Sequence, residues 1–337
     1  MHSSLTVAVD AMSGDHGPSV CVPGALAVLR EEPLVSIALV GQPAALEPGL
    51  AGLSPSERER VRIVAATQIV AMDERPRDAI RRKKDSSLRR AVDLVATGAA
   101  DACVSSGNTG ALMATAHFVL GMIAGIERPA IISSIPAPGG ETLMLDLGAN
   151  SSATPDQLLQ FAVMGSVVAA DLLGRAAPRI GLLNIGSEDI KGHELVQAAH
   201  QRLQSSRLHY VGYVEGNHIF SDQVDVVVTD GFTGNVALKT MEGLARMIAG
   251  TIREEFTRSP WRKLGALAAR PALDGLRERL DPRRYNGAGM VGLAGVVIKS
   301  HGGADATAFA HAVRLAVVEA RNGVPSHISA QFKIQAA

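Results

Sequence analysis

The chain has 337 residues, and its 33 lysines and arginines balance 33 aspartates and glutamates, which argues against nucleic-acid binding through overall charge. Apolar residues make up 47% of the chain but aromatic residues only 3%, so we expect a core of Ala, Val, Leu and Ile, as is typical of α/β proteins. The length allows one large or two ordinary domains.

The two cysteines, Cys21 and Cys103, lie in apolar surroundings. Small buried thiols are therefore expected rather than a disulfide or a metal site, and they favour a cytoplasmic protein. Residues 1–6 are too short and too polar for a signal peptide, and we expect no apolar run of membrane-spanning length. Any contact with a membrane is expected to be peripheral.

Strands and helices are predicted in alternation from the first residues onwards. Residues 5–9, 35–40 and 61–65 indicate strands, and a helix is predicted at about 19–31. This alternation favours βαβ units and a mostly parallel sheet.

The turn after the first strand is a candidate binding site, because ligands of open parallel sheets gather at the carboxyl ends of the strands. Its candidate residues are Asp10, Gly14, Asp15 and His16. The alternative is that the two aspartates cap the following helix. The turn does not show the Gly-x-Gly-x-x-Gly pattern of dinucleotide-binding proteins.

Residues 75–90 form a basic segment in which only Asp78 and Asp85 are acidic. One interpretation is a solvated helix face, and the other is a docking surface for an acidic partner, or for a phosphate near Ser86 and Ser87. The residues assigned to that surface are Arg75, Arg77, Arg81, Arg82, Lys83 and Lys84, together with Lys191 further along the chain.

Residues 101–114 carry the strongest local signal for a ligand site. A small strand at 102–104 breaks into a polar, glycine-containing loop, and helix-forming residues resume at 111. A helix that begins there directs unpaired N–H groups at whatever lies in the loop, and anions are the usual ligand. The alternative is an ordinary strand-to-helix turn. The candidate residues are Ser106, Gly107, Asn108, Thr109 and Gly110.

Further strands are predicted at 129–135, 142–147, 180–184 and 224–229, with a long apolar helix at 155–173. Turns rich in Gly, Asp and Asn follow several of these strands, and their recurrence favours one shared active site. The candidate residues in and after these turns are Asp146, Asn150, Asp230, Thr233, Asn235 and Lys239.

A helix predicted at 241–256 leads into residues 258–284, the least core-like stretch of the chain. Leucines lie on one face of two short predicted helices, broken at Pro271, and basic residues lie on the other. This face either packs against the parent domain or a dimer mate, or binds an anionic membrane surface. The leucines are Leu264, Leu267, Leu273, Leu276 and Leu280.

A last strand, beginning at 296, is followed by Lys299, His301 and two glycines, before a helix at about 305–321. A strand end of this kind suits a cation and a proton donor. The alternative is a surface lysine and a structural histidine.

Six motifs occur in order along the chain, at residues 7–15, 103–113, 145–150, 183–186, 230–235 and 299–302. Together they resemble the motifs of the PlsX family, the bacterial phosphate acyltransferases of phospholipid synthesis. The resemblance extends from residue 5 to about residue 321.

The resemblance implies a single α/β domain over residues 1–337. Its fold would be a three-layer α/β/α sandwich with a mostly parallel sheet, similar to phosphotransacetylases and isocitrate-dehydrogenase-like enzymes, with a helical protrusion at 241–284. It also implies a homodimer bound peripherally to the inner face of the cell membrane. The implied reaction moves a fatty acyl group from the acyl carrier protein thioester to inorganic phosphate without a cofactor. The acyl phosphate would then pass to a membrane glycerol-3-phosphate acyltransferase.

The residues found above fit this reaction. Phosphate needs N–H donors and a cation, which the 106–110 loop with Lys239 or Lys299 would supply. Asn108, Asn235 or backbone amides would stabilise the oxyanion, at roughly 3–4 kcal/mol for each well-placed donor. His301 would donate a proton or hold phosphate. The residues expected to orient the cations or the phosphate hydroxyl are Asp10, Asp15, Asp146 and Asp230. The acidic carrier protein is expected to dock on the basic segment with Lys191.

Three other interpretations stay open at this point. A covalent acyl-enzyme through Cys103, Ser105 or Ser106 is less favoured, because phosphate is itself the nucleophile. A nicotinamide-dependent dehydrogenase on a similar fold is disfavoured by the missing dinucleotide pattern. The third is a non-catalytic scaffold that binds membranes through residues 258–284.

Overall fold

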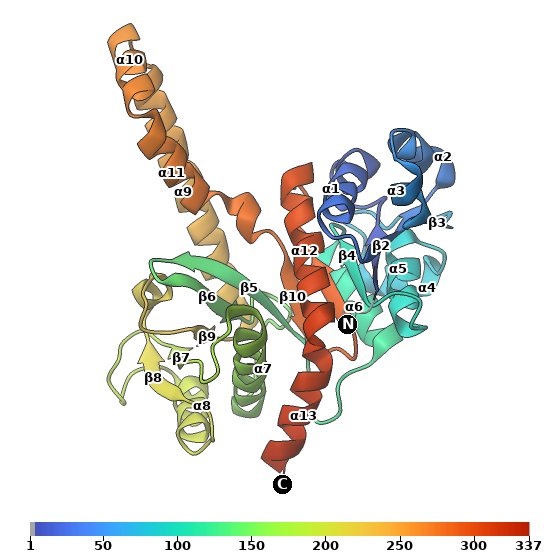
Figure 1. Ribbon diagram of the computed structural model, residues 1–337. Coiled ribbons are helices and arrows are strands. Elements are labelled where there is room, and N and C mark those ends of the chain that lie inside the picture. Colours follow the sequence, from blue (N-terminus) through green and yellow to red (C-terminus); the bar gives the residue numbers. More distant parts are fainter. Residues whose placement is uncertain (1–3, 337) are drawn as a thin grey trace.

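The structure is a computed structural model that describes residues 4–336, without the side chains of residues 276–280, 282, 335 and 336. Its centre is an 11-stranded sheet with strand order β3-β2-β1-β4-β11-β10-β5-β6-β9-β7-β8, and helices cover both faces (Figure 1). The strands are β1 (Leu5–Asp10), β2 (Val35–Gly41), β3 (Val61–Ala65), β4 (Ala102–Ser105), β5 (Ala130–Ala137), β6 (Gly140–Leu145), β7 (Ile180–Leu183), β8 (Tyr210–Val214), β9 (Val226–Val228), β10 (Ala288–Val291) and β11 (Val296–Lys299).

The helices follow the predicted alternation. They are α1 (Pro18–Glu31), α2 (Pro43–Leu46), α3 (Pro55–Glu59), α4 (Pro76–Arg82), α5 (Ser87–Ala96), α6 (Thr109–Leu120), α7 (Pro155–Leu173), α8 (Glu194–Gln204), α9 (Gly231–Thr257), α10 (Pro260–Ala268), α11 (Arg270–Leu280), α12 (Ala306–Asn322) and α13 (Val324–Ala336), with 3-10 turns η1 (Glu47–Leu50), η2 (Gly216–Phe220) and η3 (Pro282–Tyr285). The α/β class and the mostly parallel sheet are confirmed, whereas β8, β10, α2, α3, α8 and α13 were not predicted.

The sheet contains two sets of strands that run in opposite directions. The first set, β3, β2, β1, β4 and β11, is parallel throughout. Next, β10 is antiparallel to both β11 and β5, and β6 is antiparallel to β5. The second set, β6, β9, β7 and β8, is again parallel within itself. The carboxyl ends of β6, β9 and β7 therefore point away from those of β1, β4 and β11.

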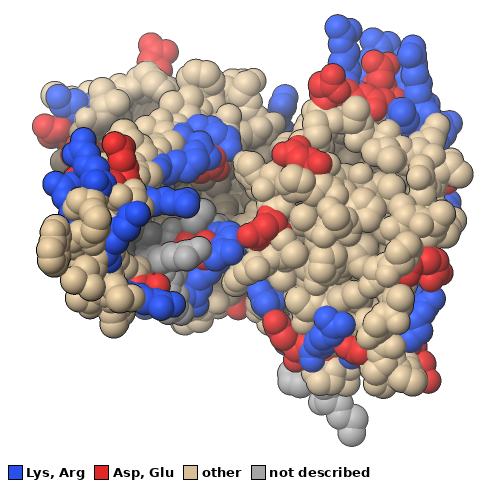
Figure 2. All heavy atoms as spheres, turned by 90° about the horizontal axis from the view of Figure 1, so that it is seen from above, with Lys and Arg blue, Asp and Glu red and all other residues tan. Residues whose placement is uncertain are grey.

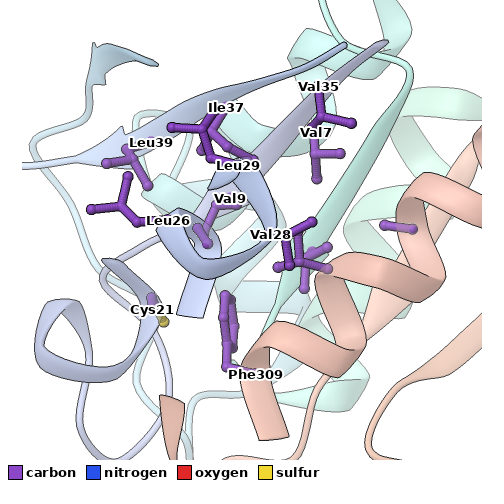
Figure 3. Close-up of a cluster of buried hydrophobic side chains, with 14 of the residues drawn as sticks. Val7, Val9, Cys21, Leu26, Val28, Leu29, Val35, Ile37, Leu39 and Phe309 are labelled. Atoms are coloured by element: carbon purple, nitrogen blue, oxygen red, sulfur yellow. The ribbon is translucent and has the colours of Figure 1, made fainter. Parts of the chain in front are cut away.

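The first set of strands is held by a core of small and branched apolar residues. Side chains from β1 and β2 pack against α1 and α12, as Figure 3 shows for Val7, Val9, Leu29, Ile37 and Phe309. All five are completely buried, so the low aromatic content of the sequence is compatible with a continuous core.

Helix α7 is a core helix of the second half of the sheet. By length and composition it is apolar enough to cross a membrane, contrary to the expectation from the sequence. Half of that stretch is buried inside the protein, and Phe161, Met164 and Val168 pack into the cluster that includes β6 and β9. Tertiary packing thus accounts for its apolar character.

The second half of α9 projects away from the sheet with α10 and α11 (Figure 1). The predicted helix at 241–256 is the outer part of this continuous 27-residue helix. Helix α11 has Pro271 in its first turn, where proline is tolerated, so the predicted break lies between α10 and α11. Lysines and arginines gather around this protrusion in the view from above (Figure 2).

Candidate active site

Three candidate side chains lie side by side because of the strand register. Asp10 is paired with Ser105, and Ser105 is paired with Lys299, at the carboxyl ends of β1, β4 and β11. The residues two positions earlier, Ala8, Cys103 and Val297, belong to the core that packs against α5 and α6. Side chains two residues apart on a strand point to the same face of the sheet. All three therefore point to the same face of the sheet.

Asp10 is fully buried in a network of hydroxyl groups. Ser105 Oγ donates to Asp10 Oδ2 at 2.6 Å, while Asp10 Oδ1 has no hydrogen-bond partner within the described residues. Burial raises the pKa of the Asp10 carboxyl, and the hydrogen bond from Ser105 opposes that shift. The Asp10–Ser105 hydrogen bond had no signal in the sequence, where the two residues are far apart.

Lys299 is the cation of this cluster. Its Nζ donates to the Ser300 carbonyl oxygen and lies 3.4 Å from the Ser106 carbonyl oxygen. Burial and then the positive charge of Lys239 lower the pKa of Lys299 to about 8, against the opposing charges of Asp10 and Asp15. The amine is thus largely charged at neutral pH and begins to lose its charge just above it.

The turn after β1 packs against the loops after β4 and β11. The Asp15 N–H donates to the Gly302 carbonyl oxygen at 2.9 Å. Gly14 has φ of +82°, and a Cβ there would lie 2.5 Å from Ser106 Oγ. Ser106 Oγ itself donates to the Ser13 carbonyl oxygen at 2.9 Å. The turn after β1 and the loop after β4 therefore meet, as predicted, and the loop after β11 joins them; Gly14 is required for their close approach.

Asn108 is the N-cap of α6. Its Oδ1 accepts from the Ala111 N–H at 2.9 Å, and its Nδ2 donates to the carbonyl oxygens of Met72 and Glu74 at 2.6 and 3.1 Å. Both amide hydrogens are therefore used inside the protein. This geometry gives Asn108 a positioning role, and its predicted contact with the oxyanion stays a prediction.

The first helical N–H groups of α6 remain available to a ligand. Asn108 receives the hydrogen bonds of Ala111 and Leu112, and the Gly107 N–H donates to Ser105 Oγ. The N–H groups of Thr109 and Gly110 have no acceptor in the part of the chain that is described, and both residues are exposed. Free N–H groups at a helix N-terminus beside a lysine suit an anion.

His301 lies exposed in the loop after β11. Its Nδ1 accepts from the Gly303 N–H at 3.1 Å, which places the proton of the neutral ring on Nε2. Its own N–H donates to Asn286 Oδ1 at 2.9 Å, and Asn286 Nδ2 donates to Ser300 Oγ at 2.9 Å. Asn286 thus holds the loop that carries Lys299 and His301, and sequence reasoning missed it.

The loop after β6 is a support rather than an open site. Asp146 is fully buried, and its two carboxylate oxygens accept hydrogen bonds from the N–H groups of Ile131, Gly148, Ala149 and Asn150. Asn150 Nδ2 donates to Asp146 Oδ2 and to the Pro129 carbonyl oxygen. Because these polar atoms are used internally, the geometry does not support the predicted contact of Asp146 and Asn150 with phosphate.

Asp230 caps α9, accepting from the N–H and the hydroxyl of Thr233 at 2.9 and 2.7 Å. Asn235 and Thr233 are exposed in the first turns, and Asn235 packs against Gly148. This cap belongs to the opposite end of the sheet from Asp10, because β9 runs against β1. The expectation that all the polar turns form one site is therefore wrong: the turns form two clusters. Lys239, two turns into α9, brings a positive charge from the second cluster towards Lys299.

The basic segment is exposed on α4 and beside it, next to the N-terminus of α6. Arg75, Arg77, Arg81, Arg82 and Lys84 are exposed, and Lys83 is half-buried. Pro76 lies so near that a Cβ at Gly110 would be 3.0 Å from its Cγ. Lys191 follows β7, near the opposite edge of the sheet from β3 and α4. The structure therefore does not bring Lys191 together with the other basic residues.

The cysteines are buried and free, as predicted. Burial raises the pKa of the Cys21 thiol to about 12 and that of Cys103 further still. Neither is a thiolate at neutral pH, which argues against an acyl-enzyme through Cys103.

The leucines of the protrusion differ in exposure. Leu264 and Leu267 on α10 are 58% and 62% exposed, beside Trp261 at 82%, whereas Leu273 is half-buried. The side chains of Leu276 and Leu280 lie outside the described residues.

The fold is shared with solved phosphotransacetylases. The chain superposes on a phosphotransacetylase from Streptococcus pyogenes with a TM-score of 0.64 at 16% sequence identity, covering 94% of both chains. It superposes on the EutD phosphotransacetylase from Staphylococcus aureus with a TM-score of 0.61 at 13% identity, covering 95% of this chain and 96% of that one. These similarities establish a phosphotransacetylase-like fold.

Sequence comparison places the chain within a family. The model of the fatty acid synthesis protein family matches residues 5–327. A phosphate acyltransferase from Alkalilimnicola ehrlichii is 54% identical over 333 residues, 99% of this chain and 97% of that protein. Another from Nitrosococcus oceani is 54% identical over 331 residues, 98% and 97% of the two chains. The chain belongs to this family, the PlsX family that the six motifs indicated, and it is an acyltransferase.

Proposed function

We propose that the enzyme transfers a fatty acyl group from the thioester of acyl carrier protein to inorganic phosphate. The observation that supports this most directly is Lys299, a partly buried cation beside the open N-terminus of α6. Such a site suits a phosphate ion, and relatives that are 54% identical carry the name phosphate acyltransferase.

In this reaction, Lys299 and the N–H groups of Thr109 and Gly110 hold phosphate. A phosphate oxygen attacks the thioester carbonyl carbon, the C–O bond forms, and the C–S bond breaks. The leaving thiolate takes up a proton, for which His301 Nε2 is the exposed donor. The buried Asp10 carboxylate raises the pKa of Lys299 and so favours the charged form of its amine. No covalent acyl-enzyme is needed.

We propose that α4 is the docking surface for the carrier protein. Its arginines are exposed, and the segment before it is tied to the α6 loop through the Asn108 amide. Phe118 on α6, 67% exposed with the Arg89 guanidinium 5.6 Å from its ring centre, adds an apolar contact to this surface. A basic surface steers an acidic partner, and an aromatic side chain anchors it.

We propose two roles for the protrusion. The tip of α10, with its exposed tryptophan and leucines among arginines and lysines, suits the inner face of the cell membrane. The exposed Leu244, Met247 and Ile248 on α9 suit the homodimer contact. Membrane binding would release the acyl phosphate, a poorly water-soluble product, near a membrane glycerol-3-phosphate acyltransferase.

The test is acyl phosphate formation from a long-chain acyl carrier protein and inorganic phosphate, followed by mass spectrometry. We expect product that depends on phosphate and collapses in Lys299→Ala, with a smaller loss in Asn108→Ala. Lys333→Ala, at an exposed lysine on α13, serves as the control and should keep full turnover. Undiminished product in Lys299→Ala would place the active site elsewhere, and no product from any carrier thioester would contradict the proposal.

A further inference from the structure

A cavity of about 260 Å³ lies between α7 and α12, over β5, β6 and the segment that leads into β10. It is on the opposite face of the sheet from the Lys299 side chain, because α12 packs against the other side of β11. Its volume equals that of about nine water molecules in the liquid, at ~30 Å³ each. The cavity therefore has room for a medium-length alkyl chain.

Two glycines, Gly287 just before β10 and Gly289 within it, leave space under α12. The positions that a Cβ would take at both glycines lie against α12. A Cβ at Gly287 would lie 3.1 Å from Ala312 Cα, and one at Gly289 would lie 2.6 Å from Glu319 Oε1. The Glu319 carboxyl therefore occupies the space of a missing side chain at the wall of the cavity.

Glu319 is an unusual group for this position. It is only 4% exposed, and no hydrogen bond to its carboxyl is found within the described residues. Burial alone raises its pKa to about 8. It is therefore a neutral acid at pH 7, and an apolar ligand can lie against it only in that form.

The cavity is polar at one end and apolar at the other. Arg284, Tyr285 and His311 line the end near η3, where burial and then the positive charges of Arg314 and Arg284 lower the pKa of His311. Asp281 and Glu31 oppose that effect, Arg314 donates to Glu31, and Glu141 is exposed at the rim. Two cationic side chains, Arg284 and Arg314, and one carboxylate, Glu141, therefore line this end. The last turns of α7 contribute Val168, Leu172 and Leu173 to the apolar wall.

Asn286 connects the cavity with the catalytic loop. It lines the polar end, and its side chain holds Ser300 and His301 through hydrogen bonds of 2.9 Å each. It also donates to the Ala308 carbonyl oxygen of α12 at 2.7 Å. A molecule that moves or fixes Asn286 therefore acts on the loop that carries Lys299.

We propose that this cavity is an effector site for a single-chain amphiphile with a medium-length alkyl chain and an anionic carboxylate or phosphate head, and that Asn286 couples its occupancy to phosphate binding. The head lies at the arginine end and the chain lies along α12 towards α7. The proposal rests on the proposed function only in its choice of a fatty acyl type of ligand.

The test is calorimetric titration of the full-length protein with octanoate, decanoate and decyl phosphate, without carrier protein, so that it does not depend on acyl transfer. Decanoate should bind about fifteenfold more tightly than octanoate, since each methylene contributes about fourfold. Val318→Trp fills the cavity and should weaken binding at least tenfold, as a conservative expectation for a blocked site. Val211→Trp, at a valine of similar exposure on β8, should bind normally. Thermal unfolding checks that both variants fold.

Wild-type affinity in Val318→Trp, or no binding to the wild type, would overturn the site. If decyl phosphate binds more tightly than decanoate, the ligand is an acyl phosphate product; the reverse order indicates a free fatty acid, and both orders support the site. Affinity should fall about tenfold between pH 7 and 9 as Glu319 ionises, and Glu319→Gln should abolish this fall. Bound decanoate should also change the KM for phosphate at least twofold in the wild type but not in Val318→Trp; an unchanged KM would refute the coupling through Asn286.

Discussion

The charge of Lys299 should set the upper pH limit of phosphate use. Its pKa of about 8 means that the charged fraction falls from about nine-tenths at pH 7 to about one-tenth at pH 9. A lysine binds phosphate in its protonated form, so activity should decrease as the pH rises. It is retained below pH 8 and lost above it. We expect kcat/KM for phosphate to fall about tenfold for each pH unit above 8.

Two substitutions isolate this effect. Lys299→Arg keeps the charge beyond the accessible pH range, so the alkaline fall should disappear even if the overall rate is lower. Lys299→Met removes a charge-assisted contact of about 1.5–3 kcal/mol, which corresponds to a loss of about 10- to 150-fold at pH 7. Lys239→Met should move the alkaline limit to higher pH, because Lys239 helps to lower the Lys299 pKa.

The assay is initial-rate kinetics with varied phosphate at pH 6 to 10 and saturating acyl carrier protein. Ionisation of phosphate itself affects the wild type and Lys299→Arg equally. The difference between their two pH profiles therefore reports only the ionisation of residue 299. An alkaline fall of the same position and slope in Lys299→Arg would refute the assignment of Lys299 as the phosphate-binding cation.

Three further predictions concern other parts of the molecule. Gly14→Ala combines a φ of +82° with a collision against the loop after β4, so it should destabilise the protein by more than Gly98→Ala, where φ is +68° but the space is open. Urea unfolding measures the difference in the free energy of unfolding between the two variants, expected at about 1–3 kcal/mol. Equal losses would contradict the packing argument. Arg77→Glu with Arg81→Glu should raise the KM for acyl carrier protein at least tenfold, and less so at high salt, while leaving the KM for phosphate unchanged; a salt-independent effect would point away from docking on α4. Leu267→Glu should reduce co-sedimentation with anionic vesicles several-fold, and unchanged binding would exclude lipid contact by α10.

Local signals in the sequence were sufficient for most of the elements and for grouping Asp10, the 106–110 loop and Lys299. Asp10, Ser106 and Lys299 each follow a short apolar strand and precede glycines, and parallel strands bring such ends together. Strand β10 was missed because Ala288–Val291 is short and contains glycine, which weakens any strand signal. That omission matters, since β10 is the strand at which the direction of the sheet changes.

The reversal at β10 explains why the sequence grouped too many turns into one site. A turn after a strand looks the same whichever way the strand runs, so no local pattern separates Asp146 and Asp230 from Asp10. The hydrogen bonds of Asn286 were equally invisible, because their partners come from a different segment of the chain.

Helix α9 gives the reversed half of the sheet a role at the first site. It begins at Asp230, where Gly231 and Gly234 pack so closely on the Asp146 loop that a Cβ at either position would lie within 2.5 Å of a backbone oxygen. From that fixed start it carries Lys239 towards Lys299 and continues into the protrusion. Any movement of the protrusion at a membrane would therefore act through a rigid helix on a charge that tunes the Lys299 pKa. Lys239, rather than the Asp146 turn, is therefore the residue through which the second half of the sheet acts on the Lys299 pKa.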